Sequence, residues 1–265
     1  MKPLLFKNYF DKLFWKVDFI ITKNSNINGL ASLTFLINQV PKNGQCFVDQ
    51  YNGISLSTTF NIKCFDWIDT DGSIERYEFF ATYSGNENPI ALNYNSNGDL
   101  LIQLPQGPDY DFYKLYLFVN IIDDTYGVTV YNITQPVTVM PNDNLANNLA
   151  ASIASNDPNS PFLQDLNSGN LNLVAKNVIA LSSVFNIQSL STSTATTSTT
   201  TITNAENDKK AALREFLIGK VAELSVSDMS SIKVIASALS SASANTDQIS
   251  RNAAVCKNLY LKIKC

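Results

Sequence analysis

Carboxylate side chains gather around one turn of the sequence and could bind a cation. Asp69 and Asp71 lie in this turn, Glu75 follows it, and Trp67 precedes it. Carboxylates are ligands that calcium prefers, but an EF-hand with its glycine at Gly72 would put Trp67 at the first ligand position. A tryptophan cannot be the first calcium ligand, so this register excludes an EF-hand. A plain solvated turn is favoured, and a looser ion site between strands is the alternative.

The absence of histidine excludes most familiar catalytic sites. With no histidine in the chain, neither a Ser-His-Asp or Cys-His pair nor an HExxH zinc site can form. Asp109, Asp111, Asp123 and Asp124 could supply paired carboxylates, but the sequence does not set a nucleophile, a base and an orienting group together. We therefore predict a protein that is not an enzyme, with no catalytic residues, no metal and no cofactor.

The cysteines predict one disulfide. Cys46 and Cys64 close a short loop in a strand-rich region and form no CxxC motif, so we expect a bridge between them. Loop closure of this size stabilises the fold by about 3 kcal/mol and implies an oxidising compartment. Cys256 and Cys265 would lie about 13 Å apart on a continuous helix, so they would not pair with each other.

Two further features concern the surface. Asn132-Ile133-Thr134 is the only N-x-S/T sequence, which makes Asn132 a candidate for N-glycosylation in a secreted chain. A dense aromatic segment follows Pro108 and could form a carbohydrate platform, although packing between strands is the favoured interpretation. Its members are Tyr110, Phe112, Tyr113, Tyr116 and Phe118.

Charge and hydropathy limit the partners. The net charge of −4 leaves no basic footprint for nucleic acid, so we expect none as a partner. No run of roughly 18 apolar residues is present, so contact with a membrane would come only through other parts of a longer protein.

Lys7 and Asp11 interrupt the N-terminal apolar stretch too early for a signal peptide. We therefore expect a fragment of a longer product.

Apolar residues alternate with a period of two from residue 14 to about residue 140, which predicts many short strands. Turn clusters rich in Gly, Pro, Asn and Asp separate them. This pattern is typical of a β-sandwich of the immunoglobulin or fibronectin III type. The clearest strands are expected in the segments 14–21, 33–37, 56–64, 77–81, 100–104, 115–121, 128–130 and 137–139.

After Pro141 the period changes to about 3.6, which predicts a small all-α region. We expect helices with apolar stripes in the segments 143–153, 174–185, 203–224, 229–239 and 249–263. The third should begin with a capping box from Thr203 to Glu206. The predicted organisation is 1–40 as the tail of a preceding β module, 41–141 as the sandwich, 142–188 as helical, 189–203 as a Ser/Thr-rich linker and 204–265 as a second helical part.

One segment resembles a known family. Residues 43–79 follow the pattern N-G-x-C, x-G-x-x-L-x-T-x-F-x-I-x-C, W-x-D and Y-x-F, which is similar to the receptor-for-egg-jelly (REJ) region of polycystin-like membrane proteins. Residues 69–78 also look like part of a polycystic kidney disease (PKD) type immunoglobulin-like repeat. More loosely, residues 143–265 resemble the helical start of a GAIN domain, and they are truncated relative to it. Its autoproteolytic motif needs a histidine, which this chain lacks.

The resemblance implies a structure and a role. The bridge would join adjacent strands, and the core signature would be Trp67, Phe60, Tyr77 and Phe79. The chain would be a non-catalytic module on the extracellular face of the plasma membrane. It would act in ligand binding, adhesion or mechanical spacing, with an unknown extracellular protein or glycan as its partner. The alternatives are a secreted lectin-like module that binds carbohydrate and a non-functional gene fragment.

Overall fold

The structure, a computed structural model, describes residues 14–23, 26–83, 89–142, 148, 151–153, 155, 157–191 and 200–244. Most of the helix expected from Asp143 lies outside these residues. So do the last expected helix and both of its cysteines, Cys256 and Cys265. Residues 192–199, at the centre of the Ser/Thr-rich tract, are also outside them.

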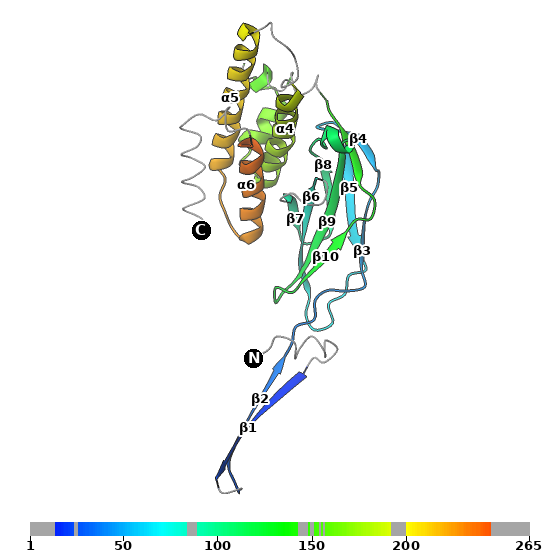
Figure 1. The fold of residues 1–265 in the computed structure, drawn as a ribbon, viewed down its shortest axis with the longest axis vertical. Helices are drawn as coiled ribbons and strands as arrows, with labels where there is room; N and C mark the ends of the chain where they lie inside the picture. Colours follow the sequence, from blue (N-terminus) through cyan, green and yellow to red (C-terminus); the bar gives the residue numbers. More distant parts are fainter. Residues whose placement is uncertain are drawn as a thin grey trace.

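Strands β3 to β11 form the β-sandwich that the alternating pattern predicted (Figure 1). The six-stranded sheet has the order β4-β11-β9-β6-β7, with β10 paired to β9, and the opposing three-stranded sheet has the order β3-β5-β8. Strand β4 pairs with β11 in parallel, and the other pairs in the two sheets are antiparallel. The strands are β3 (Gln45–Val48), β4 (Asn52–Ile54), β5 (Thr59–Phe65), β6 (Ile74–Thr82), β7 (Ile90–Asn95), β8 (Asp99–Gln103), β9 (Lys114–Asp123), β10 (Val128–Asn132) and β11 (Val137–Met140).

The sandwich core consists of alternate residues from the facing strands. Phe60 and Ile62 of β5 pack in one cluster with Phe79 of β6 and with Leu117 and Val119 of β9. All five side chains are almost completely buried. Burying one side chain of this size contributes about 1.5–3 kcal/mol, so these five side chains together stabilise the sandwich strongly.

Two details of the predicted strands were wrong. Leu56 does not begin β5: it follows β4 with a positive φ of 62°, and the amide of Thr58 donates to the carbonyl of Ile54 in a turn. Its side chain packs with the helices instead of in the sandwich. Val128 and Val130 of β10 are 43% and 57% exposed, because they point to the face of the sheet opposite the core.

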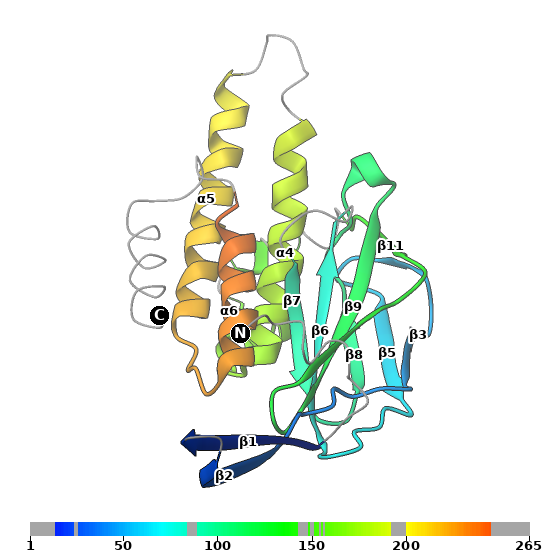
Figure 2. The same cartoon turned by 60° about the horizontal axis from the view of Figure 1, so that its bottom comes forward.

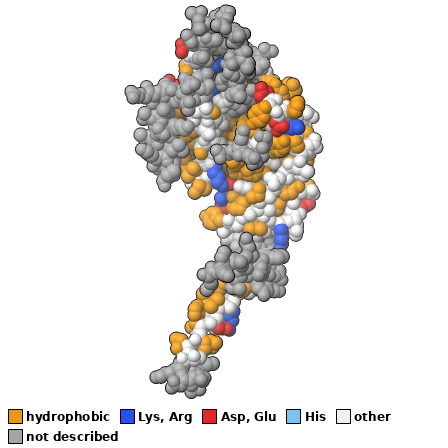
Figure 3. Space-filling view, in the orientation of Figure 1, with side chains coloured by type: hydrophobic (Ala, Val, Ile, Leu, Met, Phe, Trp, Pro, Cys, Tyr) orange, Lys and Arg blue, Asp and Glu red, His pale blue; other side chains and the backbone are white. Residues whose placement is uncertain are grey.

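A two-stranded hairpin extends from one end of the sandwich (Figure 1). It consists of β1 (Phe14–Lys23) and β2 (Asn26–Leu36), which pair with each other in a sheet of their own. Many of its apolar side chains are exposed, including Phe19 at 58% and Leu33 at 57%, and they form the orange band on the projection in Figure 3. That residues 1–40 belong to a preceding β module stays a prediction.

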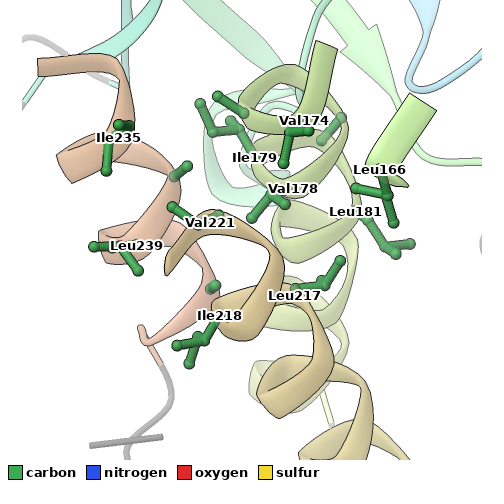
Figure 4. Close-up of a cluster of buried hydrophobic side chains, with 14 of the residues drawn as sticks. Leu166, Val174, Val178, Ile179, Leu181, Leu217, Ile218, Val221, Ile235 and Leu239 are labelled. Carbon is green, nitrogen blue, oxygen red and sulfur yellow. The ribbon is translucent and has the colours of Figure 1, made fainter. Parts of the chain in front are cut away.

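The helical region is a bundle around α4 (Leu171–Ser191), which packs against α3 (Pro161–Asn167), α5 (Thr200–Ala222) and α6 (Met229–Ala242). Helix α4 is apolar on nearly all sides, as expected for a helix enclosed by its neighbours. Its predicted stripe of Val174, Val178, Leu181 and Phe185 is buried. Figure 4 shows side chains of this stripe, such as Val178, in one apolar cluster with side chains of α5 and α6, such as Leu217 and Ile235.

Three helix predictions needed correction. Helix α3 was not predicted, although Ser160 as N-cap and Pro161 at the first position mark its start. Helix α5 begins at Thr200, so Thr203 lies inside it and does not start the helix as predicted. The run of Thr residues can be helical because each Thr or Ser costs a helix less than about 0.7 kcal/mol. Helices α4 and α5 thus extend into both ends of the predicted linker 189–203.

The buried face of α6 also differs from the prediction. Met229 is 62% exposed, whereas Val234, Ala238 and Ala242 join Ile235 and Leu239 in the buried face. The buried side of α6 is the one that packs against α4 and α5. The positions of these two helices therefore determine which residues of α6 are buried.

Candidate functional site

The distinctive site of the molecule is the junction between the larger sheet and the helices. Alternation along β6 puts Tyr77 and Phe79 in the sandwich core, so Glu78 and Phe80 point to the other face. That face is covered: α4 and α6 lie beside β7 in Figures 1 and 2, and they contact it. Both faces of β6 are therefore buried, which explains its continuous apolar run from Phe79 to Ala81.

Glu78 lies at the centre of this junction. Its side chain is only 3% exposed and accepts hydrogen bonds from Lys233 Nζ at 2.7 Å and from Ser230 Oγ at 2.6 Å, both on α6. Arg76 Nε lies 3.4 Å from the same carboxylate. Burial alone would raise the pKa of Glu78, but the bonds from Lys233 and Ser230 and the charge of Lys233 outweigh it and lower that pKa.

Further polar contacts hold the helices to the sheet. Ser237 Oγ accepts a hydrogen bond from the Ala91 amide at 2.8 Å, which satisfies a backbone donor on the edge strand β7. Ser183 Oγ of α4 accepts one from the Gln106 amide at 3.1 Å, after β8. Serine side chains on both α4 and α6 therefore hydrogen-bond to the backbone of the sandwich.

The first turn of α6 is arranged to fit the sheet. Asp228 is the N-cap, and it exchanges hydrogen bonds with Ser231 in a capping box. Tyr94 Oη of β7 lies 3.4 Å from the Asp228 carboxylate. Burial tends to raise the pKa of Asp228, but hydrogen bonds from the Ser231 amide, Ser227 and Tyr94 outweigh this and lower it.

Apolar contacts surround these polar ones. Phe80 of β6 and Phe118 of β9 stack in parallel with ring centroids 4.9 Å apart. Phe80, Ala91 and Leu56 belong to the same buried cluster as the helical core. One continuous core thus extends from the bundle onto the outer face of the sheet.

A second site contains the predicted signature residues. The structure joins Cys46 and Cys64, directly opposite each other on β3 and β5, by a disulfide. Phe60, Phe79 and Tyr77 are buried in the sandwich core. Trp67 is half-buried at the edge of this core and packs edge-to-face on Tyr131, with ring centroids 5.7 Å apart.

Gly44 is required beneath this tryptophan. A Cβ atom on Gly44 would lie 2.2 Å from Cγ of Trp67, closer than any real side-chain contact. The N-G-x-C motif therefore has a packing reason for its glycine, which is close approach of the backbone to an indole ring.

The carboxylates proposed for a cation have separate structural partners. Asp71 accepts a hydrogen bond from the Gln39 amide, Asp69 accepts one from the Asp71 amide, and Glu75 pairs with Arg76 at 2.8 Å. Burial, together with the negative charges of Asp71 and Asp123, raises the pKa of Asp69. Among the residues that the structure describes, no group of three or more such side chains is arranged to hold a metal ion.

Asp123 has a structural role at the turn after β9. Its buried carboxylate accepts hydrogen bonds from Asn38 Nδ2 at 2.7 Å and from the amides of Thr125 and Gly127. Burial tends to raise the pKa of Asp123, but these hydrogen bonds outweigh it and lower the pKa. Asp123 thus connects the turn to the base of the β1–β2 hairpin.

The aromatic segment is divided between two environments. Tyr110 and Phe112 are 60% and 76% exposed, on or beside the short 3-10 helix Asp109–Asp111. Tyr116 donates a hydrogen bond to Asp111, and Phe118 packs on Phe80 as described. Tyr113 is half-buried. The five rings therefore do not form one platform, and the favoured interpretation of interstrand packing applies to Phe118.

Asn132 is exposed at the end of β10, and the Thr134 side chain is exposed as well. Within the described parts of the chain, none of the helices is both long and apolar enough to cross a membrane.

The fold is a disulfide-bridged β-sandwich whose outer face carries a helical bundle. A family model for the REJ domain matches residues 12–180. The chain therefore belongs to the REJ domain family, whose members are non-catalytic and lie in the extracellular regions of receptor-like proteins. The match extends across the sandwich and into α4. No curated protein matches the chain.

Proposed function

We propose that this chain is an extracellular module of a polycystin-like receptor, in which it acts as a rigid spacer that holds neighbouring parts at a fixed separation and can present surfaces for ligands or adhesion. The observation that carries this proposal is the buried contact of Glu78 with Lys233 and Ser230. A spacer must transmit force without its parts separating, and a charged cluster buried between sheet and bundle ties them into one unit.

Two other features support a mechanical role. The disulfide between Cys46 and Cys64 prevents β3 and β5 from separating under load. Asp123, through Asn38, holds the base of the hairpin to the sandwich. Both contacts lie where the chain enters the sandwich from its N-terminal side.

Single-molecule pulling on the two ends of the full chain tests the proposal. A rigid spacer should unfold the sheet and the bundle in a single step, whereas Glu78→Gln should add an earlier, low-force step as the bundle detaches. Glu75→Gln is the matched control, because this carboxylate is 46% exposed and pairs with Arg76 on its own strand instead of with α6. Detachment of the bundle at low force in the unmodified chain would contradict the spacer role.

A secreted lectin-like function is the second candidate, favoured by the exposure of Tyr110 and Phe112. Lys114 Nζ lies 5.8 Å from the centre of the Phe112 ring and adds a hydrogen-bond donor beside it. A glycan array with the unmodified chain and the Tyr110→Ser/Phe112→Ser double variant tests this. Sugar binding that is lost in the double variant supports the lectin, and absence of binding in both excludes it.

A further inference from the structure

The geometry around Asn132 goes beyond a sequence motif. Asn132 is the last residue of β10 and lies directly opposite Phe118 of β9. Cross-strand partners have Cβ atoms about 5 Å apart and point to the same side of the sheet. The side chains of Asn132 and Phe118 therefore share the outer face, whereas Ile133 is buried.

Beside Asn132 the outer face has a hollow of about 540 Å³. The hollow combines two aromatic rings with polar and aliphatic side chains: it is lined by Thr82, Pro89, Tyr116, Leu117, Phe118, Asn132, Ile133 and Thr134. Aromatic faces attract the C–H groups of a sugar because the ring face is negatively polarised, and hydroxyl groups can bond its oxygens. The two rings together with the polar side chains of Thr82, Asn132 and Thr134 therefore match the mixed apolar and polar surface of a sugar.

We propose that Asn132 carries an N-linked glycan and that the first N-acetylglucosamine lies in this hollow against Tyr116 and Phe118. In the transfer step, Nδ2 of Asn132 attacks C1 of an oligosaccharide held on a lipid pyrophosphate. The new C–N bond forms as the C1–O bond breaks, the lipid pyrophosphate leaves, and Nδ2 loses one proton to a base. The proposal depends on the extracellular placement of the family but not on the spacer role.

The glycan would also protect an edge of the sheet. Strand β10 pairs with β9, and its outward residues Val128 and Val130 are exposed apolar side chains on the same face as Asn132. Edge strands of this kind invite pairing with other chains. A bulky, hydrated sugar two residues beyond Val130 would block the approach of a second strand.

Occupancy is tested by secreting the full chain from eukaryotic cells and measuring its mass before and after treatment with a glycan-removing amidase. The unmodified chain should lose one glycan mass, and Asn132→Gln and Thr134→Ala should lack it. Thr134→Ser is the matched control, because it keeps an N-x-S acceptor and should retain the glycan. A secreted, folded chain without a glycan at Asn132 overturns the proposal and leaves the family placement intact.

The position of the first sugar is tested with three forms of the unmodified sequence. One carries the whole glycan, one is trimmed by an endoglycosidase to a single N-acetylglucosamine, and one is made in cells with oligosaccharide transfer blocked. The single sugar should preserve slow amide exchange in β10 and the melting temperature, while the sugar-free form should melt roughly 2 °C lower. Identical behaviour of the last two forms overturns the placement in the hollow.

Discussion

The carboxylate of Glu78 and the ammonium group of Lys233 lie 2.7 Å apart, although 155 residues separate them in the chain. The carboxylate is almost fully buried, whereas the Lys233 side chain remains 40% exposed. Their contact joins the sheet to the last described helix, so it couples two regions that the alternation of residues alone would leave independent.

Removing either partner of the Glu78–Lys233 pair should be harmful. Glu78→Ala leaves the buried Ser230 hydroxyl without its acceptor and should cost about 3 kcal/mol of unfolding free energy. Lys233→Met leaves the buried Glu78 carboxylate with only Ser230 and the more distant Arg76 as partners, and should also cost about 3 kcal/mol. Urea denaturation measures both, with Glu75→Gln expected to stay within about 0.5 kcal/mol. Equal losses for Glu78→Ala and Glu75→Gln would show that the junction does not depend on this charge.

Stability should fall in acid partly through Glu78. Its pKa in the folded protein lies below the ordinary value of 4.5, so its contribution is complete above that pH and is lost as the pH falls through the folded pKa. Asp123 and Asp228, also with lowered pKa values, act in the same direction below their ordinary value of 3.8. Asp69, with a raised pKa, opposes them, because its contribution is lost as the pH rises through its folded pKa.

Denaturation of the unmodified chain and of Glu78→Gln between pH 7 and pH 3 isolates this contribution. The variant should be less stable at neutral pH and should lose less of its unfolding free energy on acidification, so that the two curves converge. Parallel curves would show that Glu78 has the same pKa in the folded and unfolded states.

The disulfide should stabilise the sandwich mainly by restricting the unfolded chain. Cys46 and Cys64 are 18 residues apart, and closing a loop of this length contributes about 3 kcal/mol. The Cys46→Ala/Cys64→Ala double variant should lose this amount in denaturant unfolding. Adding a reductant should then lower the stability of the unmodified chain but not that of the double variant. Equal sensitivity of both proteins to the reductant would assign the effect to other cysteines.

Two glycine substitutions should have opposite effects. Gly44→Ala forces Trp67 away from the backbone and should cost about 2 kcal/mol, as overpacking usually does. Gly219→Ala, in α5 with no atom within 4 Å of the added Cβ apart from neighbouring residues and backbone of its own helix, should stabilise the protein by about 0.5–1 kcal/mol. Trp67 fluorescence in a Trp15→Phe background should shift to longer wavelength only for Gly44→Ala. An unchanged spectrum and stability there would mean that the indole does not rest on Gly44.

Local periodicity was enough to identify much of the sandwich. Phe60, Ile62 and Cys64 alternate along β5 and are buried as the pattern predicted, because a strand turns every second side chain to the same face. The pairing of Cys46 with Cys64 followed from their spacing and context. The helical stripe from Val174 to Phe185 was equally visible, since it repeats with the period of a helix.

The tertiary structure decided what covers the second face of the sheet. Sequence alternation could not distinguish whether Glu78 meets solvent or a helix that follows more than 150 residues later. For the same reason it did not show that Leu56 packs with the helices, that Val128 and Val130 are exposed, or which face of α6 is buried. Whether each of these residues is buried or exposed depends on which surfaces meet after folding, whereas the alternation itself depends only on backbone geometry within each strand.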